Sequence, residues 1–495
     1  MKPSFEQFRT LGDDRQYVPV YREYLADLET PVSVLRRFAE DKHVFLFESV
    51  EGGERFGRYS FIGLNPYGIF TVEDGQAYLA KPGRAKEALG ERGKGFFELR
   101  RLMAEAQAVP VEGLPPLFGG AVGSMDYEIV GEFERLPLHR PAEERPEAIF
   151  MLTNEMIIFD NVRHTVMIAV SVRRSDYRDA ESAYGDAESR IARIREKMTA
   201  PLPQQELEPE TALGAETRLE PNMTKAAFCE MVRRAKEHIV AGDIIQVVPA
   251  QKFRAPAPRH PFTIYRALRL INPSPYLFFI KNGNRILIGS SPETMVKLEN
   301  GVAAVRPIAG TRRRGQTQQE DERLADELLS DAKEKAEHLM LVDLGRNDLG
   351  RLAMPGSVQV RSFMQVERYS HVMHLVSNIE AQLQPQYDAF DLVAASFPAG
   401  TLSGAPKIRA MEIIHELELE ARGAYGGAVG YFSSTGNMDL AITIRTLEIS
   451  GRTLSLGAGA GIVADSIPES EYQETLNKAG ALMKALSLAD HGLSL

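Results

Sequence analysis

Short apolar runs separated by polar turns dominate the first part of the chain. Runs whose length is typical of strands occupy residues 43–49, 58–64, 148–160 and 164–172. A charged segment with helical spacing follows at about 174–198. The order of these runs favours an α+β arrangement, in which antiparallel hairpins are expected rather than parallel crossovers.

The second part of the chain alternates strands with longer helices. Its first helix lies within residues 224–243, where a Thr cap precedes helical spacing and a Gly marks the end. Further strands are expected within residues 285–291, 302–310, 428–434, 440–449 and 453–464, and helices at about 319–343, 386–396, 404–418 and 470–487.

A segment without any period separates these two parts. Residues 196–222 are rich in Glu, Pro and Gln, which is typical of a surface linker. The predicted division is therefore an N-terminal portion at 1–195, a linker at 196–222 and a C-terminal portion at 223–495.

Composition narrows the class of protein. The 495 residues are 44% apolar and 25% charged, as in an ordinary globular protein. A net charge of −10 argues against general binding to nucleic acid or anionic lipid, so the expected partners are small molecules or proteins. One cysteine, Cys229, cannot form an intrachain disulfide, and no signal-length or membrane-length apolar run occurs. A soluble cytoplasmic protein is expected, and it contains no tryptophan.

Glycine is concentrated near the C-terminal end. Eleven of the 40 glycines lie within residues 400–461. Glycines at strand ends often mark places where the backbone approaches a ligand, although turns in a β-rich region explain the same pattern. The C-terminal portion is therefore the expected location of the active site.

Two predicted helices carry pairs of glutamates. Glu334 and Glu337 share one helix face, and Glu471 and Glu474 repeat the spacing on a second helix. Four carboxylates would suit Mg²⁺, which binds a few carboxylates together with water and substrate oxygens. The alternative is a pair of solvated faces with i,i+4 ion pairs, such as Glu474 with Lys478.

Other charged motifs are ambiguous when taken alone. Three consecutive arginines within residues 306–315 would form either a solvated loop or a segment facing an anion. Glu293, which follows a proline at a strand end, would be a solvated carboxylate or a general acid. The glycine-rich residues 456–463 lack the spacing of a dinucleotide site.

The order of the motifs is more informative than any one of them. The chain resembles the chorismate-utilising enzymes, and most closely the large component of anthranilate synthase, through PIAGTRRRG, KEKAEHLMLVDLGRNDL, VERYSHVMHLVS, GTLSGAPK, RGAYGGAVGYF, DLAITIRT and GAGAGIVADSIPESEYQET. The N-terminal half is similar to the regulatory portion of that family through FLFESVEGGERFGRYSFIG and INPSPYLFF. The resemblance implies a mixed α/β fold with large antiparallel sheets in a sandwich flanked by helices.

The resemblance also implies a metal and a substrate. Glu337 and Glu474 would bind Mg²⁺ directly, while Glu334 and Glu471 would act through water. Chorismate would be held by the metal and by a set of residues that supply positive charge, backbone amides and a phenol: Gly310, Thr311, Tyr425, Arg445, Gly459, Ala460 and Gly461.

The implied reaction adds ammonia to chorismate, expels the 4-hydroxyl group, and then eliminates pyruvate to give anthranilate. Hydroxide is a poor leaving group, so a general acid must protonate it, and Glu293 occupies the family position with that role. His374 is at the position tied to pyruvate elimination, and Thr401 is expected close by.

Two positions separate this chain from other members of the family. Gln246 replaces the lysine that activates water in isochorismate synthases, and Ala309 replaces a lysine common in aminodeoxychorismate synthases. Both differences favour anthranilate as the product. The alternatives are an aminodeoxychorismate synthase large subunit and a catalytically silent subunit that senses tryptophan, although the full set of catalytic residues argues against silence.

A partner and a regulator are implied as well. Because the surroundings of Cys229 do not resemble a glutamine-hydrolysing site, ammonia should come from a separate glutamine amidotransferase subunit. The family binds L-tryptophan as a feedback inhibitor between two segments that here read FLFES and NPSPYLFF. The candidate residues are Ser49, Pro275, Tyr276 and Leu277.

Overall fold

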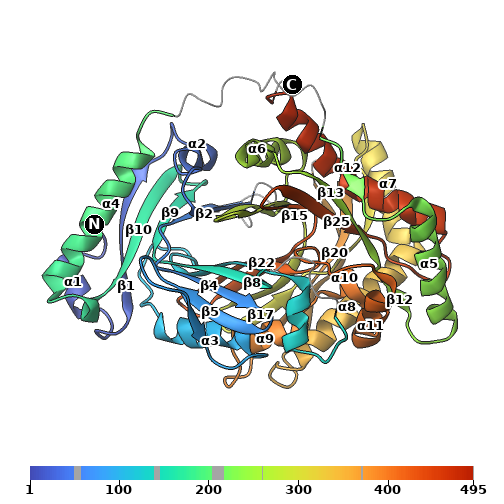
Figure 1. Ribbon diagram of the computed structural model, residues 1–495, viewed down its shortest axis with the longest axis horizontal. Helices are drawn as coiled ribbons and strands as arrows, with labels where there is room; N and C mark the ends of the chain where they lie inside the picture. Colours follow the sequence, from blue (N-terminus) through green and yellow to red (C-terminus); the bar gives the residue numbers. More distant parts are fainter. Residues whose placement is uncertain (50–56, 139–144, 203–216, 259, 370–371, 494–495) are drawn as a thin grey trace.

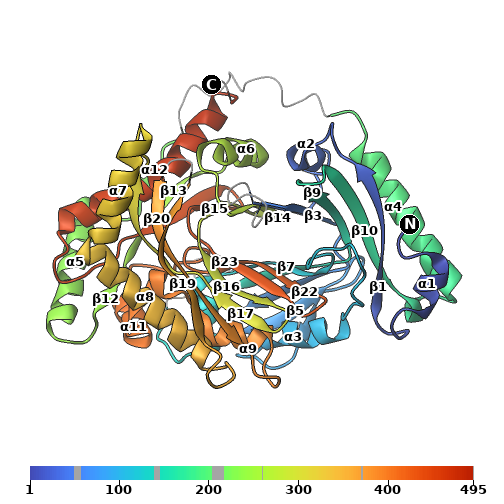
Figure 2. The same cartoon turned by 180° about the vertical axis from the view of Figure 1, so that it is seen from behind.

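The computed structural model describes residues 1–49, 57–138, 145–202, 217–258, 260–369 and 372–493. Two large antiparallel sheets form its centre, which confirms the predicted mixed α/β class with large antiparallel sheets. Figures 1 and 2 show the sheets one above the other, with helices around them. Each sheet takes strands from both sides of the predicted linker. Part of that linker, residues 203–216, lies outside the described residues.

The first sheet has eleven strands, and five of them come from the N-terminal portion. In spatial order they are β1 (Tyr17–Leu25), β10 (Thr165–Arg173), β9 (Glu155–Asp160), β3 (Tyr59–Leu64), β2 (His43–Glu48), β14 (Tyr276–Asn282), β15 (Arg285–Ser291), β24 (Thr446–Ser450), β25 (Thr453–Gly459), β13 (Ala250–Pro256) and β11 (Glu220–Pro221).

The second sheet has twelve strands and continues from the C-terminal into the N-terminal portion. Its order is β18 (Ile308–Arg313), β20 (Val372–Gln382), β17 (Val302–Val305), β16 (Thr294–Glu299), β23 (Met438–Ile442), β22 (Ala428–Ser433), β7 (Gly120–Met125), β8 (Ala148–Thr153), β4 (Gly68–Glu73), β5 (Gln76–Ala80) and β6 (Glu87–Leu89), with β19 (Gln359–Arg368) paired to β20. A separate two-stranded sheet joins β12 (Gln246–Val247) to β21 (Gly404–Ala405).

Helices pack against the outer faces of the sheets. The helices are α1 (Phe5–Thr10), α2 (Pro31–Arg36), α3 (Gly95–Glu105), α4 (Ala180–Met198), α5 (Lys225–Val240), α6 (Pro261–Ile271), α7 (Gln318–Ser330), α8 (Ala332–Gly350), α9 (Ala389–Ser396), α10 (Gly400–Ser403), α11 (Lys407–Leu417) and α12 (Pro468–Asp490). Helices α4, α6 and α12 pack on the first sheet, and α3, α8 and α9 pack on the second. No helix in the described part of the chain is long and apolar enough to cross a membrane.

Separate apolar clusters fill the layers. Phe45 and Ile158 of the first sheet meet Val122 and Val429 of the second between the two sheets. A larger cluster lies under α4, α6 and α12, and another lies under α3, α8 and α9. The sandwich is therefore held on both sides of each sheet by burial of apolar surface.

Two runs that were predicted as single strands are divided between the sheets. Residues 148–160 form β8 and β9, which belong to different sheets and separate at Asn154. Residues 440–449 likewise divide into the end of β23 and the start of β24. Apolar character alone could not show these breaks, because both halves of each run are buried.

The predicted helix at 319–343 is also two helices. Asp331 leaves the helical conformation (φ −66°, ψ 112°) and its side chain caps α8 by accepting the N–H groups of Lys333 and Glu334. Leu339 of α8 is 46% exposed, whereas Leu341 and Val342 of the same helix are buried. His338 is also fully buried and contacts Ser377 through Nε2 at 2.7 Å.

Candidate functional site

Glu293 lies in the turn between β15 and β16, and its side chain is buried. Burial raises the pKa of this carboxyl group to about 7, although Thr401, Arg445 and Lys478 each lower it. A carboxyl group with this pKa is protonated in a large fraction of molecules near neutral pH, so it can donate a proton. The structure thus brings Glu293 together with Thr401 and Arg445, which lie more than 100 residues further along the chain.

The two neighbours of Glu293 are held in unusual ways. Arg445 has a φ of 48°, a conformation that costs a non-glycine residue about 1–3 kcal/mol and is concentrated at functional sites. It occupies the point where the chain passes from the second sheet to the first. Thr401 lies in α10, and within the described residues its buried Oγ1 has no well-aligned hydrogen bond although it faces Glu293.

Tyr425 packs against the glycine-rich end of β25. A Cβ on Gly457 would lie 2.4 Å from Tyr425 Cγ, and one on Gly459 would lie 2.7 Å from the phenol oxygen, so both positions require glycine. Burial raises the pKa of Tyr425, while the backbone N–H of Gly459 donates to its oxygen and lowers it. The Ala460 N–H donates to the Pro249 carbonyl at 3.2 Å.

Gln246 is buried beside the glycine-rich segment. A Cβ on Gly461 would lie only 2.5 Å from its Nε2 atom, so the amide side chain lies directly against the backbone there. Gln246 therefore belongs to the same site as Gly459 and Tyr425. An amide cannot accept a proton from water as a lysine amine can, so the group at this position does not generate hydroxide.

The glutamates of α8 and α12 face one another. Burial raises the pKa of Glu337, and the nearby charges of Glu334 and Glu474 raise it further. Burial also raises the pKa of Glu471, again with a contribution from Glu474. Lys478 pairs with Glu474 at 2.8 Å and donates to the Gly459 carbonyl at 2.9 Å, which links the carboxylates to the glycine-rich segment.

The donor set fits Mg²⁺ in its chemistry. Among the described residues, no three His, Cys, Asp or Glu side chains are close enough to form a metal-binding group by themselves. Mg²⁺ does not need such a group, because one or two carboxylates completed by water and substrate oxygens suffice. The negative charges of Glu334 and Glu474 contribute to the raised pKa of Glu337, and a bound cation would offset this repulsion.

His374 of β20 and Thr311 of β18 are directly paired on neighbouring strands, next to Gly310. His374 Nδ1 lies 3.0 Å from Thr311 Oγ1 and 3.1 Å from the Gly310 carbonyl oxygen. A carbonyl oxygen only accepts hydrogen bonds, which places a proton on Nδ1. Gly310 has a φ of 74° in an irregular part of the β18–β20 pairing, and its Cβ position is 3.1 Å from Glu334 Oε2.

The three consecutive arginines have structural partners. Arg312 pairs with Glu334 at 3.1 Å and with Asp331 at 2.8 Å, and Arg314 pairs with Asp321 at 2.7 Å. They connect β18 to α7 and α8. This arrangement favours a structural role for the segment over the alternative in which it faces an anion.

A second site lies between the two sheets. A cavity of about 120 Å³ is lined by Phe47, Glu48, Ser49, Tyr59, Phe61, Pro275, Tyr276, Leu277, Phe278, Val429, Gly430, Tyr431, Asp439 and Ala441. The set includes all four residues that the sequence suggested for an amino-acid effector. Glu48 is already engaged, because it accepts from Tyr265 at 2.5 Å and pairs with Arg269 at 3.1 Å.

Sequence reasoning missed Asp439 and Tyr431 in this cavity. Burial raises the pKa of Asp439, while Lys297 and the Tyr276 hydroxyl, which donates at 2.9 Å, lower it. The signal that could have found Asp439 is an acidic residue within the otherwise apolar strand β23. The Tyr276 hydroxyl also contacts Thr294 at 2.8 Å, and Thr294 directly follows Glu293 in the chain.

Comparison with known proteins identifies the family. The family of chorismate binding enzymes matches residues 42–484. The chain therefore belongs to the chorismate binding enzyme family, and the matched residues include the site described above. Within that family it belongs with the anthranilate synthase component 1 proteins, because it is 43% identical to the one from Acetivibrio thermocellus and 45% identical to the one from Synechocystis, covering 98% of this chain and 99% of each relative.

Comparison with solved structures also finds anthranilate synthase component I. Anthranilate synthase component I from Streptococcus pneumoniae superimposes with a TM-score of 0.76 at 34% identity and covers 93% of this chain and 99% of that one. The menaquinone-specific isochorismate synthase from Escherichia coli superimposes with a TM-score of 0.70 at 20% identity over 95% of each chain. The second likeness shows a shared fold.

Proposed function

We propose that this chain is the chorismate-converting component of an anthranilate synthase, a lyase that acts early in tryptophan biosynthesis. Membership among the anthranilate synthase component 1 proteins supports the identity of the reaction. The single observation that carries the chemistry is the buried Glu293, whose pKa of about 7 suits it to donate a proton beside two cationic side chains.

The proposed reaction uses these residues in sequence. Arg445 and Lys478 attract the carboxylates of chorismate, and Tyr425 and the glycine-rich segment border the same space. Ammonia adds at ring position 2, and the 4-hydroxyl group leaves as water after accepting a proton from Glu293. Loss of a ring proton and of the enolpyruvyl arm as pyruvate then gives the aromatic product, and His374 is the base nearest to that end of the site.

Mg²⁺ belongs to this proposal as well. Glu337 and Glu474 would hold it directly, with Glu334 and Glu471 acting through water. When bound, the ion neutralises carboxylate charge and polarises substrate oxygen. Lys478, which pairs with Glu474 in the structure, would then have its ammonium group available for the substrate.

Two residues favour anthranilate over other products. Gln246 offers no base for water, and the methyl group of Ala309, which is buried in β18, offers no nucleophile. The route left by these two residues is direct attack of ammonia on the chorismate ring. The alternative product, aminodeoxychorismate, would retain the enolpyruvyl arm, so pyruvate release separates the two proposals.

The isolated chain is expected to make anthranilate from chorismate, Mg²⁺ and ammonium salt, but not from glutamine. Glutamine hydrolysis requires an activated nucleophile, whereas Cys229 is buried in α5. Anthranilate fluorescence measured with each nitrogen donor tests this, with a cytoplasmic glutamine amidotransferase component restoring glutamine use. Glutamine-dependent turnover by the pure chain would contradict the need for that partner.

We also propose that the cavity between the sheets binds L-tryptophan as a feedback inhibitor. The cavity combines aromatic walls with a half-buried carboxylate, Asp439, which suits a ligand with an aromatic side chain and an ammonium group. Tyr276 connects Asp439 to Thr294, which directly follows Glu293. A ligand that moves Tyr276 would therefore disturb the general acid.

Asp439→Asn is expected to weaken tryptophan binding about 10- to 100-fold, because a hydrogen bond to a charged group contributes about 1.5–3 kcal/mol. The chain contains no tryptophan, so all indole fluorescence comes from the added ligand, and the change in that fluorescence on binding measures the affinity. The control is Glu299→Gln, which changes a neighbouring acid that does not line the cavity. Unchanged affinity in the Asp439 variant would place the tryptophan site elsewhere.

A further inference from the structure

Arg422 lies behind the active site and is almost completely buried, with 4% of its surface exposed. Its guanidinium group forms a bidentate pair with Glu418, at 2.5–3.1 Å. It also donates to the backbone carbonyls of Leu402 and Val248, each at 2.6 Å. One side chain therefore ties together three separate segments of the chain.

Each of those segments carries a residue of the candidate site. Leu402 directly follows Thr401, and Val248 is two residues beyond Gln246. The guanidinium carbon also lies 5.6 Å from the centre of the Tyr425 ring. The side chain of Arg422 thus contacts backbone next to Thr401 and near Gln246, and it lies close to the ring of Tyr425.

The carboxylate partner extends the same connection. Glu418 accepts the N–H of Ala250 at 2.9 Å, and Ala250 is paired with Gly459 between β13 and β25. The ion pair therefore also reaches the backbone that faces Tyr425. The centre of the Tyr127 ring also lies 4.7 Å from the guanidinium carbon.

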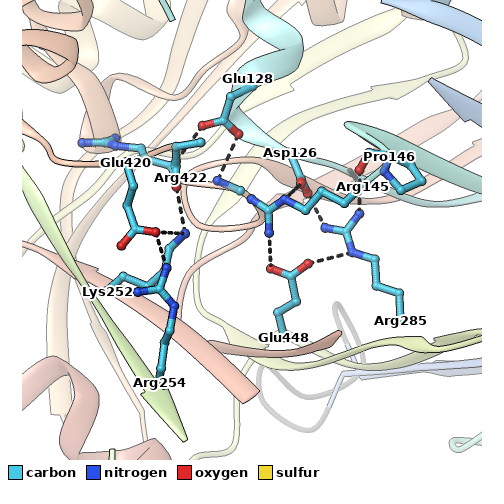
Figure 3. Close-up of polar contacts among 12 residues, drawn as sticks. Asp126, Glu128, Arg145, Pro146, Lys252, Arg254, Arg285, Glu420, Arg422 and Glu448 are labelled. Carbon is cyan, nitrogen blue, oxygen red and sulfur yellow. Dashed lines mark hydrogen bonds and ion pairs between the residues drawn. The ribbon is translucent and has the colours of Figure 1, made fainter. Parts of the chain in front are cut away.

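The backbone of Arg422 is fixed by a second carboxylate. Glu128 accepts the N–H groups of Arg422 and Gly423 at 2.6 and 3.0 Å, as Figure 3 shows. In the same view, a neighbouring network joins Arg145 and Arg285 to buried acids. Arg285 contacts Asp126 and Glu448, which belong to this network and not to the segments held by Arg422.

Stability alone does not explain a buried ion pair of this kind. Replacing such pairs by apolar residues of similar volume is often neutral or stabilising, because the charges lose hydration on burial. A planar guanidinium group, by contrast, fixes several acceptors at defined angles. The need to hold several acceptors in fixed positions explains an arginine at position 422 better than a gain in folding stability does.

The geometry points to Arg422 as a positioning residue that holds Gln246, Thr401 and Tyr425 in their places around the reacting groups. This inference rests on the proposed function, because it concerns the residues proposed to act on chorismate. Arg422 itself does not contact the reacting atoms. It acts through the backbone carbonyls of Leu402 and Val248 and through the ring of Tyr425.

Arg422→Lys tests the inference, because an ammonium group keeps the charge but cannot reach all of these acceptors in one plane. A displacement of about 1 Å at the catalytic groups costs roughly 10²-fold in rate. We expect kcat to fall by about that factor and the KM for chorismate to rise, in assays well below the melting temperature. Tryptophan affinity of the cavity between the sheets should stay unchanged.

Arg285→Lys is the matched control, since Arg285 is also buried, with 8% of its surface exposed, and is paired with two acids. It should lose melting temperature to a similar extent but keep kcat and KM within about threefold of wild type. Equal kinetic losses in both lysine variants would show that Arg422 has only a structural role. If Arg422→Lys does not fold, Glu128→Gln loosens only the backbone of Arg422 and should lower kcat severalfold, whereas unchanged kcat would refute positioning.

Amide hydrogen exchange separates this inference from the proposed function. Arg422→Lys should speed exchange within residues 246–250 and 400–405 whether or not the wild-type chain makes anthranilate. A wild-type chain without anthranilate activity would refute the proposed reaction alone. Unchanged exchange in both segments would refute the positioning role alone.

Discussion

Glu293→Gln is expected to lower kcat for anthranilate formation by about 10²- to 10⁴-fold, the usual contribution of a general acid. The amide retains the shape of the carboxylic acid but cannot donate the proton that the leaving hydroxyl group requires. The variant should still bind chorismate. Its melting temperature at pH 8 should equal or exceed that of wild type, because the wild-type carboxylate is ionised and buried there.

The pH dependence of activity and of stability tests the role of Glu293 independently. Only the protonated carboxyl group donates, so wild-type activity should decline as the pH rises through about 7, the pKa of Glu293. The folded state holds this proton more tightly than the unfolded state. Stability contributed by the group is therefore present below its ordinary pKa and is lost as the pH rises through about 7.

Glu132→Gln provides the matched control for both readouts. Burial raises the pKa of Glu132 to about 7 as well, but this carboxylate accepts the N–H groups of Gly95 and Phe96 at the start of α3. Its replacement should leave kcat and the high-pH decline unchanged. Near-normal turnover by Glu293→Gln with ammonia and chorismate would remove Glu293 from its proposed role.

Removal of Mg²⁺ by a chelator is expected to lower turnover by about 10³-fold or more, and Glu337→Gln should do the same at ordinary Mg²⁺ concentrations. Stabilisation of developing charge by a metal amounts to several kcal/mol, and 1.36 kcal/mol corresponds to a factor of ten. High Mg²⁺ should partly restore the variant, because three of the four carboxylates remain.

Calorimetric titration with Mg²⁺ in the presence of chorismate supplies a measurement that does not depend on turnover. Glu337→Gln should bind the ion far more weakly than wild type. Glu469→Gln, which removes an exposed acid from the first turn of α12, should bind it normally. Full activity after chelation would show that the two glutamate helices serve another purpose.

Much of the site could be predicted because its residues lie in ordered motifs. The sequence indicated Glu293, Thr401, Arg445 and the two glutamate pairs. The structure places Thr401 and Arg445 beside Glu293, and Glu337 near Glu474. Arg445 also shows what the sequence did not reveal. Its left-handed backbone at the passage between the sheets depends on where the run 440–449 divides, and strand residues on both sides of that division are buried.

The features that could not be predicted depend on contacts between distant segments. Asp439 is one acid in an apolar strand, and only the approach of Tyr276 and Tyr431 gives it a cavity to line. Arg422 is one arginine after a helix until the fold places Val248 and Leu402 beside it. Local spacing could not indicate the two acceptors of Arg422, because Leu402 and Val248 are 20 and 174 residues away from it in the chain.

The proposed reaction is tested most directly by the stoichiometry of its products. The isolated chain, given chorismate, Mg²⁺ and ammonium, should release one anthranilate and one pyruvate for each chorismate consumed, and the Glu293→Gln variant should release neither at a comparable rate. An amino product without pyruvate, or consumption of chorismate without incorporation of nitrogen, would contradict the assignment of this chain as an anthranilate-forming enzyme.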